Sequence, residues 1–159
     1  MNIHSIEVEL NLRHWLRDAA ALWNTNNVDQ VGIEWIEPAF GSSPGIPDCR
    51  IVFKKKSVEI ELKHLNMKKR GIEWKIRPLQ RRYHVMGAKE GKRTAILSTV
   101  NYCGRNNLIL IRGDRVPLRD YEDIEDSGGK VNYQIIEGDN EMERFRMFMR
   151  YILMETYWL

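Results

Sequence analysis

The chain has 159 residues, of which 43% are hydrophobic and 30% are charged, with 11 Gly, 5 Pro and 2 Cys. This composition is typical of an ordinary folded domain, and it excludes collagen-like, disordered and disulfide-rich chains. No segment approaches the roughly 20 apolar residues that cross a bilayer, and the N-terminus has no signal-peptide stretch. We therefore expect a soluble, cytoplasmic protein with one domain over residues 1–159, comprising a core of about 5–112 and a C-terminal extension of about 113–159.

Charge is unevenly distributed along the chain, although the formal net charge is only +3. Residues 1–49 hold 2 basic and 7 acidic residues, residues 50–93 hold 15 and 4, and residues 94–159 hold 8 and 11. The middle segment is therefore strongly basic between two acidic flanks. Because Lys and Arg bind phosphate backbones, this favours a nucleic-acid partner, while a solubilising face is the plain alternative.

The first third of the chain predicts one helix and three strands. Apolar residues recur at the spacing of one helix face over residues 6–23, which predicts an amphipathic helix. Residues 31–37 alternate and are rich in β-formers, which predicts a strand. A loop of Gly, Ser and Pro follows over 41–47, and strands are expected over 48–53 and 57–63 around a lysine-rich turn.

The remainder predicts two more helices and further strands. A basic, poorly patterned stretch is followed by Pro78, which suits a helix start, and Gly91, which suits a helix exit, so a helix is expected over 78–90. Later segments are assigned as strands 94–100 and 108–112, a turn at 113–114, a less regular strand 131–136, and a final helix from 139 or 140 to 157.

The residues with chemical potential lie between Gly45 and Lys63. If Lys55 and Lys56 form the hairpin turn, Asp48 faces Lys63 and Arg50 faces Glu61 across the two strands, all on one polar face. Asp48, Glu61 and Lys63 then converge. The plain alternative is a wet hairpin face with cross-strand ion pairs of about 1 kcal/mol or less.

Two carboxylates and an ammonium group on one patch suit the hydrolysis of a phosphodiester bond. Carboxylate oxygens are the ligands preferred by hard cations, so Asp48 and Glu61 predict a Mg²⁺ or Mn²⁺ site. Lys63 would position water or stabilise negative charge on the phosphate oxygens. The four histidines show no ligand spacing, so a zinc site is not indicated.

The turn Gly45-Ile-Pro-Asp48 before one strand and Ile60-Glu-Leu-Lys63 in the next resemble the signature of PD-(D/E)XK nucleases. The pattern is particularly similar to the virus-type replication and repair (VRR-NUC) group, which resembles Holliday junction resolvases. The resemblance covers about residues 5–100. It implies an α/β (α+β), restriction-endonuclease-like αβββαβ core, with a mixed sheet flanked by helices and here followed by a C-terminal helix. It also implies a Mg²⁺-dependent nuclease that acts on branched DNA in replication, repair or recombination.

The resemblance implies two supporting residues. Gln80, at the start of the helix after the third strand, matches a glutamine of that group and would contact the site; a plain polar residue in a first helical turn is the alternative. The group also tends to place a glutamate on the first helix as a metal ligand. Glu9 lies on the core-facing line of that helix and is preferred to Glu7, with Glu34 on the next strand as a third candidate.

The stretch between Lys63 and Gln80 is longer and more basic than the resemblance predicts, and we expect a DNA-contacting loop. Trp74 would stack on a base or pack in the core. The residues expected to bind phosphates are Lys68, Lys69, Arg70, Lys75, Arg77, Arg81 and Arg82.

Two other functions fit the same residues. One is a module that keeps the fold and binds nucleic acid without cutting, and the other is a restriction-type endonuclease. A branch-selective enzyme would most naturally act as a homodimer, because two symmetric cuts need two symmetric sites. The apolar end Tyr157-Trp158-Leu159 could serve such an interface or pack on its own domain.

Overall fold

The computed structural model describes residues 9–36, 45–68, 71–74, 76–102, 105–117, 121–123 and 133–153. Three helices and eight strands are formed there, and no helix among them is long and apolar enough to cross a membrane. The elements are α1 (Glu9–Asn26), β1 (Gly32–Trp35), β2 (Cys49–Phe53), β3 (Lys56–Lys68), β4 (Gly71–Glu73), α2 (Pro78–Lys89), β5 (Thr94–Tyr102), β6 (Arg105–Arg112), a 3₁₀ turn (Gly113–Arg115), β7 (Tyr121–Asp123), β8 (Gln134–Ile136) and α3 (Glu141–Leu153).

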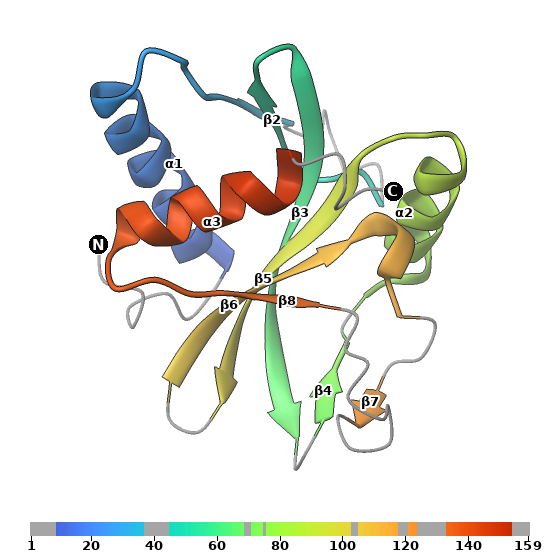
Figure 1. Cartoon of the computed structure of the whole chain (residues 1–159). Helices are drawn as coiled ribbons and strands as arrows, with labels where there is room; N and C mark the ends of the chain where they lie inside the picture. Colours follow the sequence, from blue (N-terminus) through green and yellow to red (C-terminus); the bar gives the residue numbers. More distant parts are fainter. Residues whose placement is uncertain are drawn as a thin grey trace.

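The strands form one mixed sheet in the order β1-β2-β3-β5-β6-β8. β3 and β5 pair in parallel, because α2 carries the chain back between them, and the other neighbours along this path are antiparallel. β4 pairs with the far end of β3, and β7 pairs with β4. Figure 1 shows β4 and β7 together at the lower end of the sheet.

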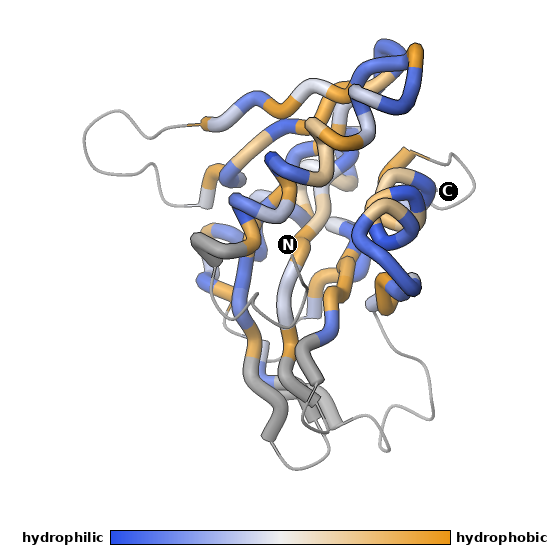
Figure 2. Tube along the Cα trace, turned by 90° about the vertical axis from the view of Figure 1, so that its left-hand side faces the viewer, coloured by the Kyte–Doolittle hydropathy of each residue, from blue (hydrophilic) through white to orange (hydrophobic). Residues whose placement is uncertain are grey.

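The helices cover opposite faces of this sheet. Helices α1 and α3 pack together over β3, whereas α2 lies apart from them (Figure 1). The larger core joins α1, α3 and the strand residues that face them, including Leu12, Phe145 and Ile60, each fully buried. A smaller core on the other face contains Leu65, Trp74 and neighbours from β5 and β6. Figure 2 shows hydrophobic positions interleaved with hydrophilic ones along the elements, as expected when each element buries one side.

The predicted α/β class and αβββαβ order are confirmed, with a mixed sheet between helices. The helix boundaries also agree: Pro78 begins α2, and Gly91, at φ +81°, follows its end. At α3, the Asn140 side chain accepts the backbone N–H of Glu143 at 2.9 Å, which is a helix N-cap. The predicted end of that helix at Tyr157 lies outside the described residues.

One prediction of the fold is wrong. The stretch after Lys63 is not a loop, because β3 continues to Lys68 and turns back into β4. The strand gave no clear signal because its apolar positions change face after Leu62, where the next apolar residues are Leu65 and Met67. Trp74, at the end of that returning segment, is 1% exposed and packs in the smaller core, so of its two predicted roles core packing is confirmed.

Candidate active site

The turn of the β2–β3 hairpin lies one residue earlier than predicted. Its central residues are Lys54 and Lys55, both with positive φ, and Phe53 pairs with Lys56. A two-residue turn of this kind matches the twist of the flanking strands. Moving the turn by one residue shifts every pair by two positions along β3 but leaves each side chain on its face. The alternation of apolar residues therefore cannot distinguish the predicted pairing of β2 with β3 from the observed one.

This register changes which charged residues face one another. The predicted pairs of Asp48 with Lys63 and of Arg50 with Glu61 are wrong, because Arg50 lies opposite Glu59. Continuing the register by one position places Asp48 beside Glu61. The two carboxylates predicted as metal ligands are thus cross-strand neighbours, and Arg50 does not neutralise Glu61.

Asp48 is held on both of its carboxylate oxygens. Oδ2 accepts the backbone N–H of Leu62 at 2.8 Å, and Oδ1 pairs with the guanidinium of Arg13 at 2.8 Å. Arg13 comes from α1 and lies 5.0 Å from the centroid of the Trp35 ring, so it is itself oriented by β1. The carboxylate at the start of β2 is therefore fixed relative to β3 and to α1.

Gly45 explains how the loop before Asp48 reaches the first turn of α2. Its φ is +98°, and a Cβ built on it would lie 2.7 Å from the backbone oxygen of Leu79. Only glycine tolerates both this conformation and this close approach without strain. The Gly45-Ile-Pro-Asp48 turn therefore packs directly against the segment that carries Gln80.

Glu61 is 5% exposed and receives a hydrogen bond from Gln80. The other end of that amide is also engaged, since Gln80 Oε1 accepts the backbone N–H of Arg77 at 3.1 Å. Because the carbonyl end is fixed at the start of α2, the amide nitrogen points at the Glu61 carboxylate. Gln80 itself is 8% exposed, so this contact is largely shielded from water.

Lys63 lies on the same face of β3, two residues beyond Glu61. Its Nζ is 4.0 Å from Glu61 Oε1, and only 14% of its side chain is exposed. An ammonium at this distance is placed to act on the same bound group as the carboxylate. Asp48, Glu61, Lys63 and Gln80 therefore surround one small region between β2, β3 and α2.

Glu59 continues the polar face of β3 in the opposite direction. Its carboxylate accepts the Tyr83 hydroxyl and pairs with Arg50 at 3.5 Å, and Arg50 also reaches Glu34 at 3.3 Å. Burial, together with the bond to Glu59, raises the pKa of Tyr83 to about 12, so this phenol stays protonated at neutral pH. Glu34 is 60% exposed in its side chain and engaged with Arg50, away from the Asp48 and Glu61 pair.

Two other titratable groups stay neutral near the site. Burial lowers the pKa of His84 to about 4, while Glu59 opposes this shift and Lys63 reinforces it; Nδ1 lies 2.7 Å from the Thr94 hydroxyl. Burial and the negative charge of Asp48 raise the pKa of Cys49 to about 12, so the thiolate is suppressed. Cys49 is a buried free cysteine, and Cys103 lies outside the described residues.

The donor set fits a hard divalent cation. Mg²⁺ uses one or two carboxylates in many sites and completes its shell with water and phosphate oxygens, which Asp48 and Glu61 would allow. Within the described residues, no three His, Cys, Asp or Glu side chains gather around one point. The predicted third ligand is not tested, because Glu9 begins α1 with its side chain outside the described set, and its alternative Glu7 lies wholly outside it.

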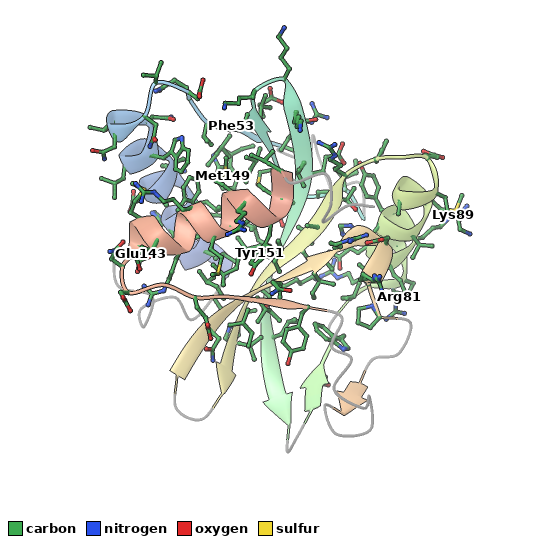
Figure 3. All side chains as sticks on the ribbon, in the orientation of Figure 1. Phe53, Arg81, Lys89, Glu143, Met149 and Tyr151 are labelled. Atoms are coloured by element: carbon green, nitrogen blue, oxygen red, sulfur yellow. The ribbon has the colours of Figure 1, made fainter. Side chains whose placement is uncertain are left out.

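Three of the seven predicted phosphate-binding residues have described side chains. Arg77, the N-cap residue of α2, and Arg82 within that helix are exposed. Arg81, labelled in Figure 3, donates through Nε to the Pro117 carbonyl at 2.8 Å. Lys68 ends β3, and its side chain is not described; Lys69, Arg70 and Lys75 lie outside the described residues. Arg81 is thus tied to the protein, and only Arg77 and Arg82 are seen on the surface.

Sequence reasoning missed three residues close to the site. Arg13 follows Glu9 by four residues on α1, and Tyr83 and His84 follow Gln80 by three and four residues on α2. Residues at these spacings share a helix face. Once Glu9 and Gln80 were placed toward the sheet, the same spacing could have identified all three.

No family model matches the chain, and no curated protein matches it either. Among solved structures, the chain is similar to Hjc, a Holliday junction resolvase from the archaeon Archaeoglobus fulgidus, at 12% identity and a TM-score of 0.46. That match covers 71% of this chain and 88% of Hjc.

Proposed function

We propose that this chain is a divalent-metal-dependent nuclease that hydrolyses DNA phosphodiester bonds. Within that class we propose a structure-selective enzyme of the PD-(D/E)XK superfamily, acting on branched DNA during replication, repair or recombination. The motif resemblance of residues 45–63 and Gln80 supports the narrower assignment. The buried Glu61 carboxylate, beside Lys63 and bonded to Gln80, is the observation that carries the broader one.

This arrangement is hard to explain by stability alone. A buried ion pair adds little net stability, because the loss of hydration of both charges offsets their attraction. An apolar residue at position 61 would pack between β3 and α2 at lower cost. Buried charged residues that add no net stability are found mainly at functional sites, which favours a catalytic role for Glu61 and Lys63.

Each residue has a distinct role in the proposal. Asp48 and Glu61 would hold Mg²⁺ or Mn²⁺, with Glu9 as the third ligand. The chemistry expected from such a cation is Lewis-acid polarisation of the phosphate and activation of water. Lys63 places a positive charge where the phosphate oxygens gain negative charge, and Gln80 orients Glu61.

The proposal is tested by cutting assays on supercoiled, flapped and four-way-junction DNA, with Mg²⁺ and with a chelator. We expect cleavage only with the metal, strongest on branched substrates, and loss of cleavage in Asp48→Asn and Lys63→Ala. Glu34→Gln is the matched control, because it makes the same kind of change on β1 away from Asp48. Calorimetric titration with Mn²⁺ gives a second readout, in which Asp48→Asn should bind more weakly.

The outcomes separate the alternatives. Equal cleavage by the wild type, Asp48→Asn and Lys63→Ala would overturn the catalytic assignment. DNA binding without cutting under any metal condition would indicate the non-cleaving module. Cutting at one short sequence regardless of branching would indicate a restriction-type endonuclease.

A further inference from the structure

A cleft of about 450 Å³ lies beside the tip of the β2–β3 hairpin and the turn from α2 to β5. It is separate from the region enclosed by Asp48 and Gln80. Its lining consists of Lys55, Lys56, Ser57, Glu59, Gly91, Lys92 and Arg93. Four of these residues are basic and one is acidic, so the lining is strongly positive.

The walls of this cleft are fixed by backbone hydrogen bonds. The Glu59 N–H donates to the Arg93 carbonyl at 3.0 Å, which joins the start of β3 to the start of β5. On the other side, the N–H groups of Gly91 and Lys92 donate to the last turn of α2 at 3.1 and 2.8 Å, forming a Schellman helix end. The cationic side chains therefore project from two well-defined turns.

The acidic residue of the cleft does not cancel this charge. The Glu59 carboxylate is engaged by the Tyr83 hydroxyl and by Arg50. Lys92 lies over the Tyr83 ring at 5.4 Å from its centroid, and Lys55 is exposed and has no ion pair among the described residues. A positive surface with its one carboxylate already paired is suited to an external anion.

The hairpin turn provides an independent indication. Lys54 and Lys55 adopt φ of +48° and +65°, a conformation that favours Asn and Gly and strains lysine. A turn built only for stability would carry Asn-Gly. Lys54 pairs with Asp29 at 3.2 Å and does not line the cleft, so it is the strain at Lys55 that points to a function of its side chain.

We infer that this cleft binds a backbone phosphate of the nucleic acid, at a second site beyond the proposed centre of cleavage. The choice of DNA as the ligand rests on the proposed function. Ser57 and Glu61 point to the same face of β3 and lie roughly 13 Å apart along the strand. That separation corresponds to about four base-pair steps along the axis of a duplex, so a single substrate would reach both sites.

The test uses the full chain with Glu61→Gln, so that binding is measured without cutting. The cleft variant combines Lys55→Gly with Lys92→Ala. The matched control combines Arg17→Ala with Arg146→Ala, which removes the same charge from exposed positions on α1 and α3. The probe is a fluorescein-labelled 30-base-pair duplex, titrated over a range of salt concentrations without divalent metal.

We expect the cleft variant to bind about tenfold more weakly, with a salt slope reduced by about 1 to 2, because each lost phosphate contact lowers the slope by about 0.9. The control variant should keep the affinity and slope of the parent. Unchanged binding in the cleft variant, or an equal loss in the control, would overturn the inference. So would an equal loss of affinity for poly-glutamate, since that would indicate attraction to any polyanion.

Folding and function are checked separately. Lys55→Gly suits the turn conformation, so its Tm should not fall; Lys55→Asn, which also tolerates positive φ, provides a second variant. Cleavage by the chain with Glu61 intact is measured in parallel. Weaker binding of the cleft variant without any cleavage by the intact chain would reject the nuclease and retain the phosphate site. Cleavage by the intact chain, together with unchanged DNA binding by the cleft variant, would retain the nuclease and reject the phosphate site.

Discussion

The two faces of β3 differ in character, because alternate residues of this strand are apolar on one face and charged on the other. Val58, Ile60 and Leu62 are fully buried against α1 and α3, while Glu61 and Lys63 meet α2 with their charges largely shielded from water. The apolar face gains stability from the area it buries. The polar face offsets part of that stability, because burying the charges of Glu61 and Lys63 costs hydration. Such a cost is expected where side chains are arranged for chemistry rather than packing.

The comparison predicts that the largest stability effect lies on the apolar face. Ile60→Ala should lower the free energy of unfolding by about 3 kcal/mol, because it leaves a cavity in a fully buried cluster. Urea unfolding measures this. Val28→Ala, at a position that is 97% exposed, is the control and should change stability by less than about 0.5 kcal/mol. A small effect of Ile60→Ala would show that the core is not where the structure places it.

The polar side contains a pH-sensitive contribution from His84. Its folded pKa of about 4 lies below the ordinary value of 6.5, so the unfolded chain binds the extra proton between these pH values. The stability due to neutral His84 is therefore complete above pH 6.5 and is lost as the pH falls to 4, by up to about 3 kcal/mol. Urea unfolding from pH 4 to 7.5 should show a steeper decline for the wild type than for His84→Gln. If the free energy of unfolding falls equally with pH in the wild type and in His84→Gln, His84 is not the cause of the decline.

Gln80 should affect activity more than stability. Gln80→Ala removes the bond that orients Glu61 and should reduce cleavage about 10- to 100-fold, as is typical when a group that orients a metal ligand is lost. Gln80→Glu is a sharper comparison, since it keeps the size of the side chain but sets a carboxylate against Glu61. If Gln80→Ala binds Mn²⁺ and cuts like the wild type, Gln80 is only a polar residue of the helix.

The smallest effect is expected at the exposed ion pair of β1. Glu34→Gln weakens a contact with Arg50 in which both side chains are largely exposed, so stability should change by about 0.5 kcal/mol or less. Thermal unfolding measures it. A loss of cleavage in this variant would instead show that the active site extends to β1.

Much of this arrangement follows from local sequence signals. Pro78 and Gly91 bracket α2, and alternation assigns Ile60 and Glu61 to opposite faces of β3. The register of the hairpin could not be obtained in this way, because the observed and the predicted turns leave every residue on the same face. It depends on which lysines accept positive φ, a choice that composition does not reveal.

The tertiary contacts also could not be predicted from the sequence. The pair of Arg13 with Asp48 joins residues 35 positions apart, and the bond of Tyr83 to Glu59 joins a helix to a strand. Along β3 the apolar residues change from Ile60 and Leu62 to Leu65 and Met67, so the alternation shifts by one residue and the continuous strand was not evident. Local patterns thus predicted the elements and their buried faces, while the partners of the charged residues required the fold.

The catalytic role of Glu61 is tested by metal-dependent cleavage of four-way-junction DNA by the wild type and by Glu61→Gln, at equal folded concentration. We expect Glu61→Gln to lose about 1,000-fold or more of the cleavage rate, because a principal catalytic group is removed, while its unfolding midpoint in urea is unchanged or raised. Undiminished cleavage by Glu61→Gln, or cleavage by the wild type that persists in a chelator, would contradict this expectation.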